Sequence, residues 1–369
     1  MNIVFRVDAS TEIGTGHVMR CLTLADYLTK QSTITFVCRE HPGHLCAYIE
    51  SRGHQVIRLP VIDELHEHKM CNMGKLRHSH WLKASQQLDA SQTIKRIKHE
   101  QVDLLIIDHY GIDAEWEREL SSYAGSIMVI DDLADRYHDC DLLLDQNFHN
   151  HLKGRYAFLV PSDCKQFLGP RYALLRKEFQ DIKSCLRDRD GQVRRILVFF
   201  GGVDSTNETM KTMNAIRRLH RSDIVTDVIA GSNNPYKGEI KAICSKFDNF
   251  MYHCQVNNMA ELMNQADLCI GAGGTTTWER CAVGLPTILI SIAENQELIA
   301  EALYKHHVIR YLGTKEQVTE SMVVSGLESV LNDSAQLKRM EKLSRELMES
   351  KQNNIRLLVE KIGERVNKK

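Results

Sequence analysis

The chain alternates between short runs of consecutive apolar residues and longer stretches whose apolar positions recur every three or four residues. The short runs are typical of strands covered on both faces, and the longer repeats are typical of amphipathic helices. In the first half we expect strands at residues 2–8, 33–38, 55–60, 102–111, 126–132 and 140–147, and helices at 16–30, 44–53, 85–99 and 113–124. Residues 61–83 are polar and aperiodic, which predicts a loop or insertion.

A second cycle begins at residue 195, after an irregular and then charged passage over residues 148–190. Strands are expected at residues 195–202, 223–231, 249–254, 266–274 and 286–293, and residues 334–367 predict a charged amphipathic helix or helix pair. We therefore expect two domains, residues 1–170 and 190–345, and a helical tail, residues 346–369. The predicted fold class is α/β, with two doubly wound, Rossmann-like parallel-sheet domains facing a central cleft.

Composition excludes several classes of function. The 369 residues carry 47 Lys and Arg against 48 Asp and Glu, which argues against a nucleic-acid partner bound by bulk charge. No apolar run reaches about 18 residues and the first strand is charged by Arg6, so we expect neither a membrane span nor a signal peptide. The eleven cysteines are scattered and form no C-x-x-C pair. We expect them to be reduced and mostly buried, in a cytoplasmic monomer.

The first candidate site follows the first strand, where Gly14-Thr15-Gly16 leads into a helix that begins near His17. Glycines let a backbone approach a ligand closely, and a helix N-terminus disfavours the protonated form of a histidine. His17 is therefore a candidate general base that is neutral at pH 7. The alternative is that His17 only caps a turn.

Four neighbours of His17 are candidate substrate-binding residues. Arg6 and Asp8 leave the carboxyl end of the first strand, Gly16 lies in the turn, and Arg20 follows one helical turn later, where it could meet an anion. The motif is neither a dinucleotide fingerprint, because "GTGHVM" lacks the third glycine, nor a P-loop.

Two more strand ends carry polar residues. Asp108, His109 and Tyr110 fall where the strand expected at 102–111 meets its loop, and Asp131 and Asp132 lie at the end of the strand expected at 126–132. Both groups fit either site residues or the caps of turns and helices, and the sequence leaves this open.

The second half offers glycine-rich turns suited to phosphate. Gly201-Gly202 and Gly273-Gly274 each join a buried strand to a helix, whose N-terminus attracts anions, with Asn207 or a neighbouring Ser or Thr as a helix cap in the first case. Glu279, on the helix after the second turn, could accept both hydroxyls of a ribose. Asn295 and Gln296 start a further helix, as caps or as sugar-binding amides.

The histidines of the polar loop have metal-like spacing at His66, His68, Cys71, His78 and His80. A second clean ligand pair is missing, so we expect no metal site and no cofactor.

Taken together, "FRVDASTEIGTGHVMRCLTLA", "LLIIDHYGID", "GPRYALLRKEF", "FFGGVDSTN" and "GAGGTTTWERCAVGLP…ENQ" span nearly the whole chain. In this order they resemble the GT-B glycosyltransferases related to MurG. The resemblance is closer to the nucleotide-sugar hydrolases of pseudaminic acid biosynthesis, the nonulosonic acid used in flagellin glycosylation.

This resemblance implies a metal-independent enzyme that hydrolyses UDP-2,4-diacetamido-2,4,6-trideoxy-β-L-altropyranose to UDP and the free sugar. His17 matches the base that activates water for inverting attack on the anomeric carbon, and Tyr110 matches an active-site tyrosine. Glu279 matches the residue that holds the uridine ribose, and Asn295 matches a substrate contact. The expected partners are this UDP-sugar and water, without nucleic acid or membrane.

Two alternatives remain. A sugar transferase of the same fold would replace water with an acceptor hydroxyl, and a binding module would hold the nucleotide sugar without turning it over.

Overall fold

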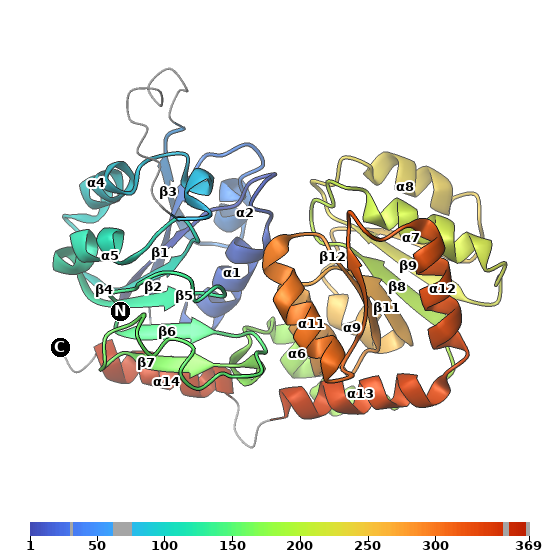
Figure 1. Cartoon of the computed structure of the whole chain (residues 1–369). Helices are drawn as coiled ribbons and strands as arrows, with labels where there is room; N and C mark the ends of the chain where they lie inside the picture. Colours follow the sequence, from blue (N-terminus) through green and yellow to red (C-terminus); the bar gives the residue numbers. More distant parts are fainter. Residues whose placement is uncertain (30–31, 62–75, 350–353, 367–369) are drawn as a thin grey trace. The chain divides into compact units, whose positions relative to one another are not determined.

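The computed structural model describes residues 1–29, 32–61, 76–349 and 354–366. The chain forms two compact units (Figure 1). The first comprises residues 1–147, 151–174 and 351–369, and the second comprises residues 148–150 and 175–350. Of the predicted tail, the part up to residue 350 belongs to the second unit and the last helix belongs to the first.

The first unit contains β1 (Asn2–Val7), α1 (Gly16–Leu28), β2 (Thr33–Arg39), α2 (Cys46–Ser51), β3 (Gln55–Leu59), the 3₁₀ helix η2 (Ser79–Leu82), α4 (Gln86–Ile97), β4 (Val102–Asp108), α5 (Ala114–Leu120), η3 (Ser121–Tyr123), β5 (Ala124–Ile130), β6 (Leu142–Asp145), β7 (Lys165–Leu168), η4 (Pro170–Tyr172) and α14 (Asn354–Val366). Its seven strands form one parallel sheet in the order β3-β2-β1-β4-β5-β6-β7.

Successive side chains of β1 point to opposite faces of the sheet and belong to two separate hydrophobic cores. Ile3, Phe5 and Val7 pack on one face with apolar residues of α1, α2 and α14. Val4 packs on the other face with residues of α4 and α5. Because both faces are covered, the central strands β4 and β5 are almost wholly apolar, as the sequence predicted.

The second unit contains α6 (Lys177–Asp181), η5 (Ile182–Cys185), β8 (Arg195–Phe199), α7 (Glu208–Arg218), β9 (Val225–Ala230), α8 (Lys237–Cys244), β10 (Phe250–Cys254), α9 (Met259–Gln265), β11 (Leu268–Gly271), α10 (Thr275–Ala282), β12 (Thr287–Ser291), η6 (Glu294–Gln296), α11 (Glu297–Lys305), β13 (Arg310–Thr314), α12 (Glu320–Leu331) and α13 (Ser334–Met348). Its sheet is also parallel, in the order β10-β9-β8-β11-β12-β13.

The two parallel sheets confirm the predicted α/β fold class. In both units the order reverses beside the first strand, with β1 between β2 and β4 and β8 between β9 and β11. Ligands of open α/β sheets bind outside the carboxyl ends of the strands at such a switch point.

Several expectations at the level of elements need correction. The irregular passage at 148–190 contains β7 and α6, and β13 was not foreseen. In the polar loop, residues 62–75 lie outside the described residues, and η2 follows them. Ten cysteines fall in the described part of the chain and all are free; Cys185 and Cys254 are exposed and the others are buried. No helix among the described residues is long and apolar enough to cross a membrane.

Candidate active site

A closed turn delivers His17 to the carboxyl edge of the first sheet. The hydroxyl of Ser10 accepts hydrogen bonds from the backbone N–H groups of Glu12 (3.1 Å) and Ile13 (2.8 Å). The N–H of Gly14 donates to the carbonyl of Ser10 at 2.9 Å, and Gly14 has a φ of +80°, which favours glycine. Helix α1 starts directly after this turn, so His17 lies in its first turn, as predicted.

His17 is held by Asp108, the last residue of β4. Nδ1 of His17 lies 2.6 Å from Oδ1 of Asp108. A carboxylate only accepts, so Nδ1 carries the hydrogen of this bond, and in the neutral ring Nε2 is the nitrogen with the free lone pair. The imidazole is thus fixed in one tautomer and orientation, the arrangement of a general base with its orienting carboxylate. The sequence argument for a neutral His17 rested on the helix dipole and did not include this carboxylate.

Arg20 ties this pair to a second carboxylate. Its Nε and Nη2 donate to the two oxygens of Asp108, both at 2.6 Å, and its Nη1 donates to Asp132, also at 2.6 Å. Burial alone would raise the pKa of Asp108, but the charge of Arg20 and the hydrogen bonds from Arg20 and His17 outweigh it and hold that pKa well below its usual range. Arg20 therefore serves first to keep Asp108 ionised.

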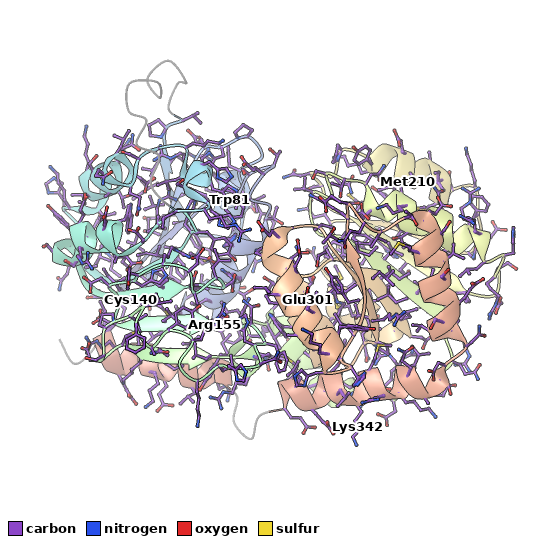
Figure 2. The ribbon with its side chains drawn as sticks, in the orientation of Figure 1. Trp81, Cys140, Arg155, Met210, Glu301 and Lys342 are labelled. Carbon is purple, nitrogen blue, oxygen red and sulfur yellow. The ribbon has the colours of Figure 1, made fainter. Side chains whose placement is uncertain are left out.

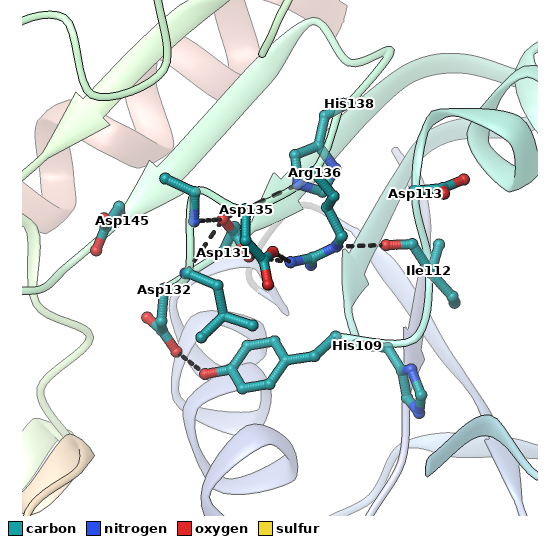
Figure 3. Close-up of polar contacts among 12 residues, drawn as sticks. His109, Ile112, Asp113, Asp131, Asp132, Asp135, Arg136, His138 and Asp145 are labelled. Atoms are coloured by element: carbon teal, nitrogen blue, oxygen red, sulfur yellow. Dashed lines mark hydrogen bonds and ion pairs between the residues drawn. The ribbon is translucent and has the colours of Figure 1, made fainter. Parts of the chain in front are cut away.

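Tyr110 and Asp132 complete the cluster (Figure 3 labels Asp132). The hydroxyl of Tyr110 donates to Asp132, which also accepts from the side-chain amide of Asn147 at 2.5 Å. Burial and the charge of Asp132 raise the pKa of Tyr110 well above its ordinary value, so this phenol stays protonated. The ring of Tyr110 packs edge-on against His17, with centroids 4.6 Å apart.

An aromatic wall made of His78, Trp81 and Tyr110 lies beside His17, and the sequence analysis did not include it. Trp81 stacks on Tyr110 at a centroid distance of 5.5 Å, and His78 contacts Trp81 at 4.6 Å (Figure 2 labels Trp81). Buried Leu82 anchors the segment in the core, and His80 pairs with Glu12. The only signal in the sequence was a tryptophan in an otherwise polar stretch.

Arg6 and Asp8, expected to bind substrate, are instead completely buried. Arg6 donates to both oxygens of Asp89 (3.0 and 2.7 Å) and pairs with Asp8 at 2.7 Å. Arg39 donates to Asp89 as well, at 2.6 Å. These charges neutralise one another inside the protein, so they hold β1, β2 and α4 together rather than contact a ligand.

His109 also belongs to this interior network rather than to the group around His17. Its Nδ1 accepts from the N–H of Gly111 at 3.0 Å, and its Nε2 lies 3.4 Å from Asp8. Burial lowers the pKa of His109 to about 3, so the ring is neutral.

The neighbouring carboxylates Asp131 and Asp132 have different roles. Asp131 accepts from the N–H of Ala134 at 2.8 Å and pairs with Arg136 at 2.8 Å, so it builds its own loop (Figure 3). Asp132 faces Tyr110 and Arg20. The alternative of a cap, left open from the sequence, therefore holds for Asp131 alone.

In the second unit, the turn from β11 to α10 is tied to the turn after β12. The amide oxygen of Gln296 accepts from the N–H groups of Gly273 (3.2 Å) and Ile292 (3.0 Å). Gly274 is the N-cap residue of α10, with a φ of +96°. Since a glycine offers no side-chain cap, the first turn of α10 presents backbone N–H groups to a ligand. Asn295 lies next to Gln296 in η6 and is half-buried.

Glu279 is buried in α10 and engaged by Arg176. Nε and Nη2 of Arg176 donate to its two carboxylate oxygens at 2.7 and 2.9 Å. Each oxygen keeps a second lone pair, so this contact orients the carboxylate without using up its capacity to accept. Arg176 was not singled out from the sequence.

The turn after β8 is less suited to phosphate than the sequence suggested. Asp204 accepts from the N–H groups of Glu208 (2.9 Å) and Thr209 (3.0 Å), so a carboxylate caps α7. Asn207, the expected cap, makes no capping bond with its side chain. Gly202 passes within contact distance of Gly231, where a Cβ would lie 2.0 Å from the Gly202 carbonyl oxygen. Of the two turns, only the one at α10 lacks an acidic cap.

No group of three or more His, Cys, Asp or Glu side chains within the described ranges is arranged to hold a metal ion. His66, His68 and Cys71 lie outside those ranges.

Comparison with known proteins finds a family model that the second half of the chain matches. Residues 195–359 match the model of the glycosyltransferase family 28 C-terminal domain. A Campylobacter jejuni protein named UDP-2,4-diacetamido-2,4,6-trideoxy-beta-L-altropyranose hydrolase is 27% identical over 83% of this chain and 97% of its own length. An uncharacterised Methanocaldococcus jannaschii protein is also 27% identical, over 79% of this chain, which spans about half of that protein (55%).

Among solved structures, MurG of Acinetobacter baumannii superposes with a TM-score of 0.62 at 14% identity, covering 98% of this chain and 99% of its own. The chain therefore has the MurG-like GT-B fold, and its second half is similar to the glycosyltransferase family 28 C-terminal domain.

Proposed function

We propose that this chain is an inverting, metal-independent hydrolase that cleaves UDP-2,4-diacetamido-2,4,6-trideoxy-β-L-altropyranose to UDP and 2,4-diacetamido-2,4,6-trideoxy-L-altrose. The observation that carries the proposal is the pair of His17 and Asp108, which leaves Nε2 of a fixed imidazole ready to take a proton. The name of the C. jejuni relative supports the choice of substrate.

In the proposed reaction, Nε2 of His17 removes a proton from a water molecule as its oxygen attacks the anomeric carbon. The bond from that carbon to the diphosphate oxygen breaks, and UDP departs with the electron pair. Because a diphosphate is a good leaving group, the reaction does not need the second, acidic carboxyl of ordinary glycosidases. Asp108 stabilises the imidazolium that forms.

Tyr110 stays protonated and lies against the ring of His17, so we assign it to positioning the base and the sugar. In the second unit, the N–H groups at the start of α10 would meet the growing charge on the diphosphate. Glu279, held by Arg176, would accept the ribose hydroxyls, and Asn295 would contact the substrate.

A transferase is the second candidate, favoured by the family 28 domain and the MurG-like fold. It would use the same base on an acceptor hydroxyl in place of water. A binding module without turnover is the third.

One experiment separates the hydrolase from the other two candidates: incubation with the UDP-sugar in ¹⁸O-labelled water containing EDTA, with mass spectrometry of both products. We expect the label in the sugar and none in UDP. Label in UDP would mean attack on phosphorus and contradict the role of His17. Absence of UDP release despite binding would favour a transferase without its acceptor or a binding module.

His17→Gln is the matching variant, and we expect it to lower kcat about 10³-fold or more because the proton acceptor is gone. His99→Gln, on an exposed loop, is the control and should keep normal turnover. Near-normal turnover of His17→Gln would refute the assignment.

A further inference from the structure

Arg280 is a buried cation under the glycine-rich turn of the second unit. It lies in α10 and is only 1% exposed. Its side chain runs back toward the start of the helix, as helical side chains do, and Nη2 donates to the carbonyl of Ala272 (2.7 Å) and to the hydroxyl of Thr277 (3.1 Å). A Cβ at Gly271 would come within 2.9 Å of Nη1, so the guanidinium lies directly against the backbone of the turn.

No carboxylate neutralises this guanidinium in the described part of the chain. Arg280 takes part in none of the ion pairs found there, and its buried Nε and Nη1 have no oxygen acceptor, the thiol of Cys269 being the other side chain with which the guanidinium interacts. The adjacent Glu279 is paired with Arg176 instead. Burial raises the pKa of the neighbouring Cys269 thiol, so this sulfur is uncharged as well.

The position of the charge is unfavourable in two ways. An unpaired buried charge costs several kcal/mol in desolvation. The N-terminal turn of a helix also carries a partial positive charge, which repels a cation. An anion at the turn would relieve both, because it would accept from the first N–H groups of α10 while the guanidinium attracts it from beneath the backbone.

We propose that Arg280 is the fixed positive charge that makes the turn Gly271–Thr275 select a nucleoside diphosphate over a nucleoside without phosphate. Its nitrogens are buried, so it acts through the backbone of the turn and is a positioning residue. This inference rests on the proposed function in one respect, the choice of a uridine nucleotide as the ligand.

The experiment measures binding of UDP, UMP and uridine to the full chain by calorimetry, and the melting temperature without ligand. Arg280→Met removes the charge and keeps the volume, and Arg280→Lys keeps the charge. Arg221→Met is the control, because it removes an exposed arginine of the same unit that pairs with Asp223.

We expect Arg280→Met to weaken UDP binding about tenfold or more and UMP binding less, with uridine binding changed less than about twofold. Its melting temperature without ligand should equal or exceed that of the unmodified chain. Arg280→Lys should recover most of the preference for UDP, and Arg221→Met should retain it.

A merely structural arginine would give the opposite pattern, with a lower melting temperature and an equal loss for all three ligands, and this would overturn the inference. An unmodified chain without preference for UDP over uridine would overturn it too. A chain that prefers UDP through Arg280 but releases none from the UDP-sugar would support the inference and contradict the proposed hydrolysis.

Discussion

The two units present their polar residues in opposite ways. Around His17 in the first unit, Asp108, Arg20 and Asp132 form a closed set of side chains with bonds of 2.6 Å. At the turn before α10 in the second unit, the groups offered are backbone amides, and Arg280 beneath them lacks an anionic partner among the described residues. In the first region each charged side chain already has a partner of opposite charge in the protein. In the second region the buried arginine would gain such a partner only if an anion bound.

This difference matches two different tasks. A base must be held in one tautomer at one angle, which neighbouring side chains do well. A site that receives developing negative charge gains most from dipoles and cations that are already oriented and not yet neutralised. The contrast predicts that substitutions in the first unit act on kcat and that substitutions in the second act on binding.

The largest effect should come from Asp108→Asn, which we expect to lower kcat about 10²- to 10³-fold, because the amide can present its NH₂ to Nδ1 and favour the wrong tautomer. UDP affinity should change little. Steady-state kinetics and calorimetry with UDP check both.

Asp131→Asn is the matched control. Asp131 is equally buried, follows the neighbouring strand β5 and pairs with Arg136 as Asp108 pairs with Arg20. Both variants should lose a similar unfolding free energy, about 2 kcal/mol, since each removes one of the two carboxylates on a buried arginine and leaves the other, Asp132 on Arg20 and Asp135 on Arg136. If Asp131→Asn lowered kcat as much as Asp108→Asn, general loss of structure would explain both.

An intermediate effect is expected for Glu279→Gln. Loss of a charged acceptor for the ribose should raise KM about tenfold and leave kcat within about twofold. Glu178→Gln removes the other carboxylate on Arg176, which lies 2.9 Å away, without touching the proposed ribose contact. A fall in kcat with unchanged KM for Glu279→Gln would contradict the proposed division between the units.

The smallest effect on activity should come from His109, whose influence lies in acid stability. Its folded pKa of about 3 lies below the unfolded value of about 6.5, so the unfolded chain binds the proton first. The contribution of His109 to the free energy of unfolding is fully present above about pH 6.5 and is lost as the pH falls toward 3. At pH 4 this loss amounts to about 3 kcal/mol. Urea unfolding of His109→Gln should show a smaller loss between pH 7 and pH 4. An equal loss in both proteins would assign the acid sensitivity to other groups.

The interior strands of both sheets could be predicted because burial on two faces makes them continuously apolar. The two strands that were missed, β7 and β13, lie at sheet edges. Lys165 and Gln166 of β7 are exposed, and all five residues of β13 are half-buried, so neither has a strong apolar signature.

For the site, the sequence indicated His17, Arg20 and Tyr110 but not which carboxylate serves His17. That partner depends on β1 and β4 being neighbours in the sheet, with Val7 opposite Asp108. The local pattern of apolar residues does not show the order of strands in a sheet. The same limit explains Arg6 and Asp8. Their place at a strand end suggested exposure, whereas Asp89, 83 residues beyond Arg6, encloses them.

The last helix, α14, affects the order in which the cores of the two units can form. Ile355, Leu358 and Ile362 of α14 are part of the core of the first unit, yet they are synthesised after all of the second. The core of the second unit is therefore complete with residues up to 350, whereas the core of the first unit also needs α14. A chain shortened to end at residue 350 should accordingly leave an apolar face of the first unit uncovered and bind a hydrophobic dye.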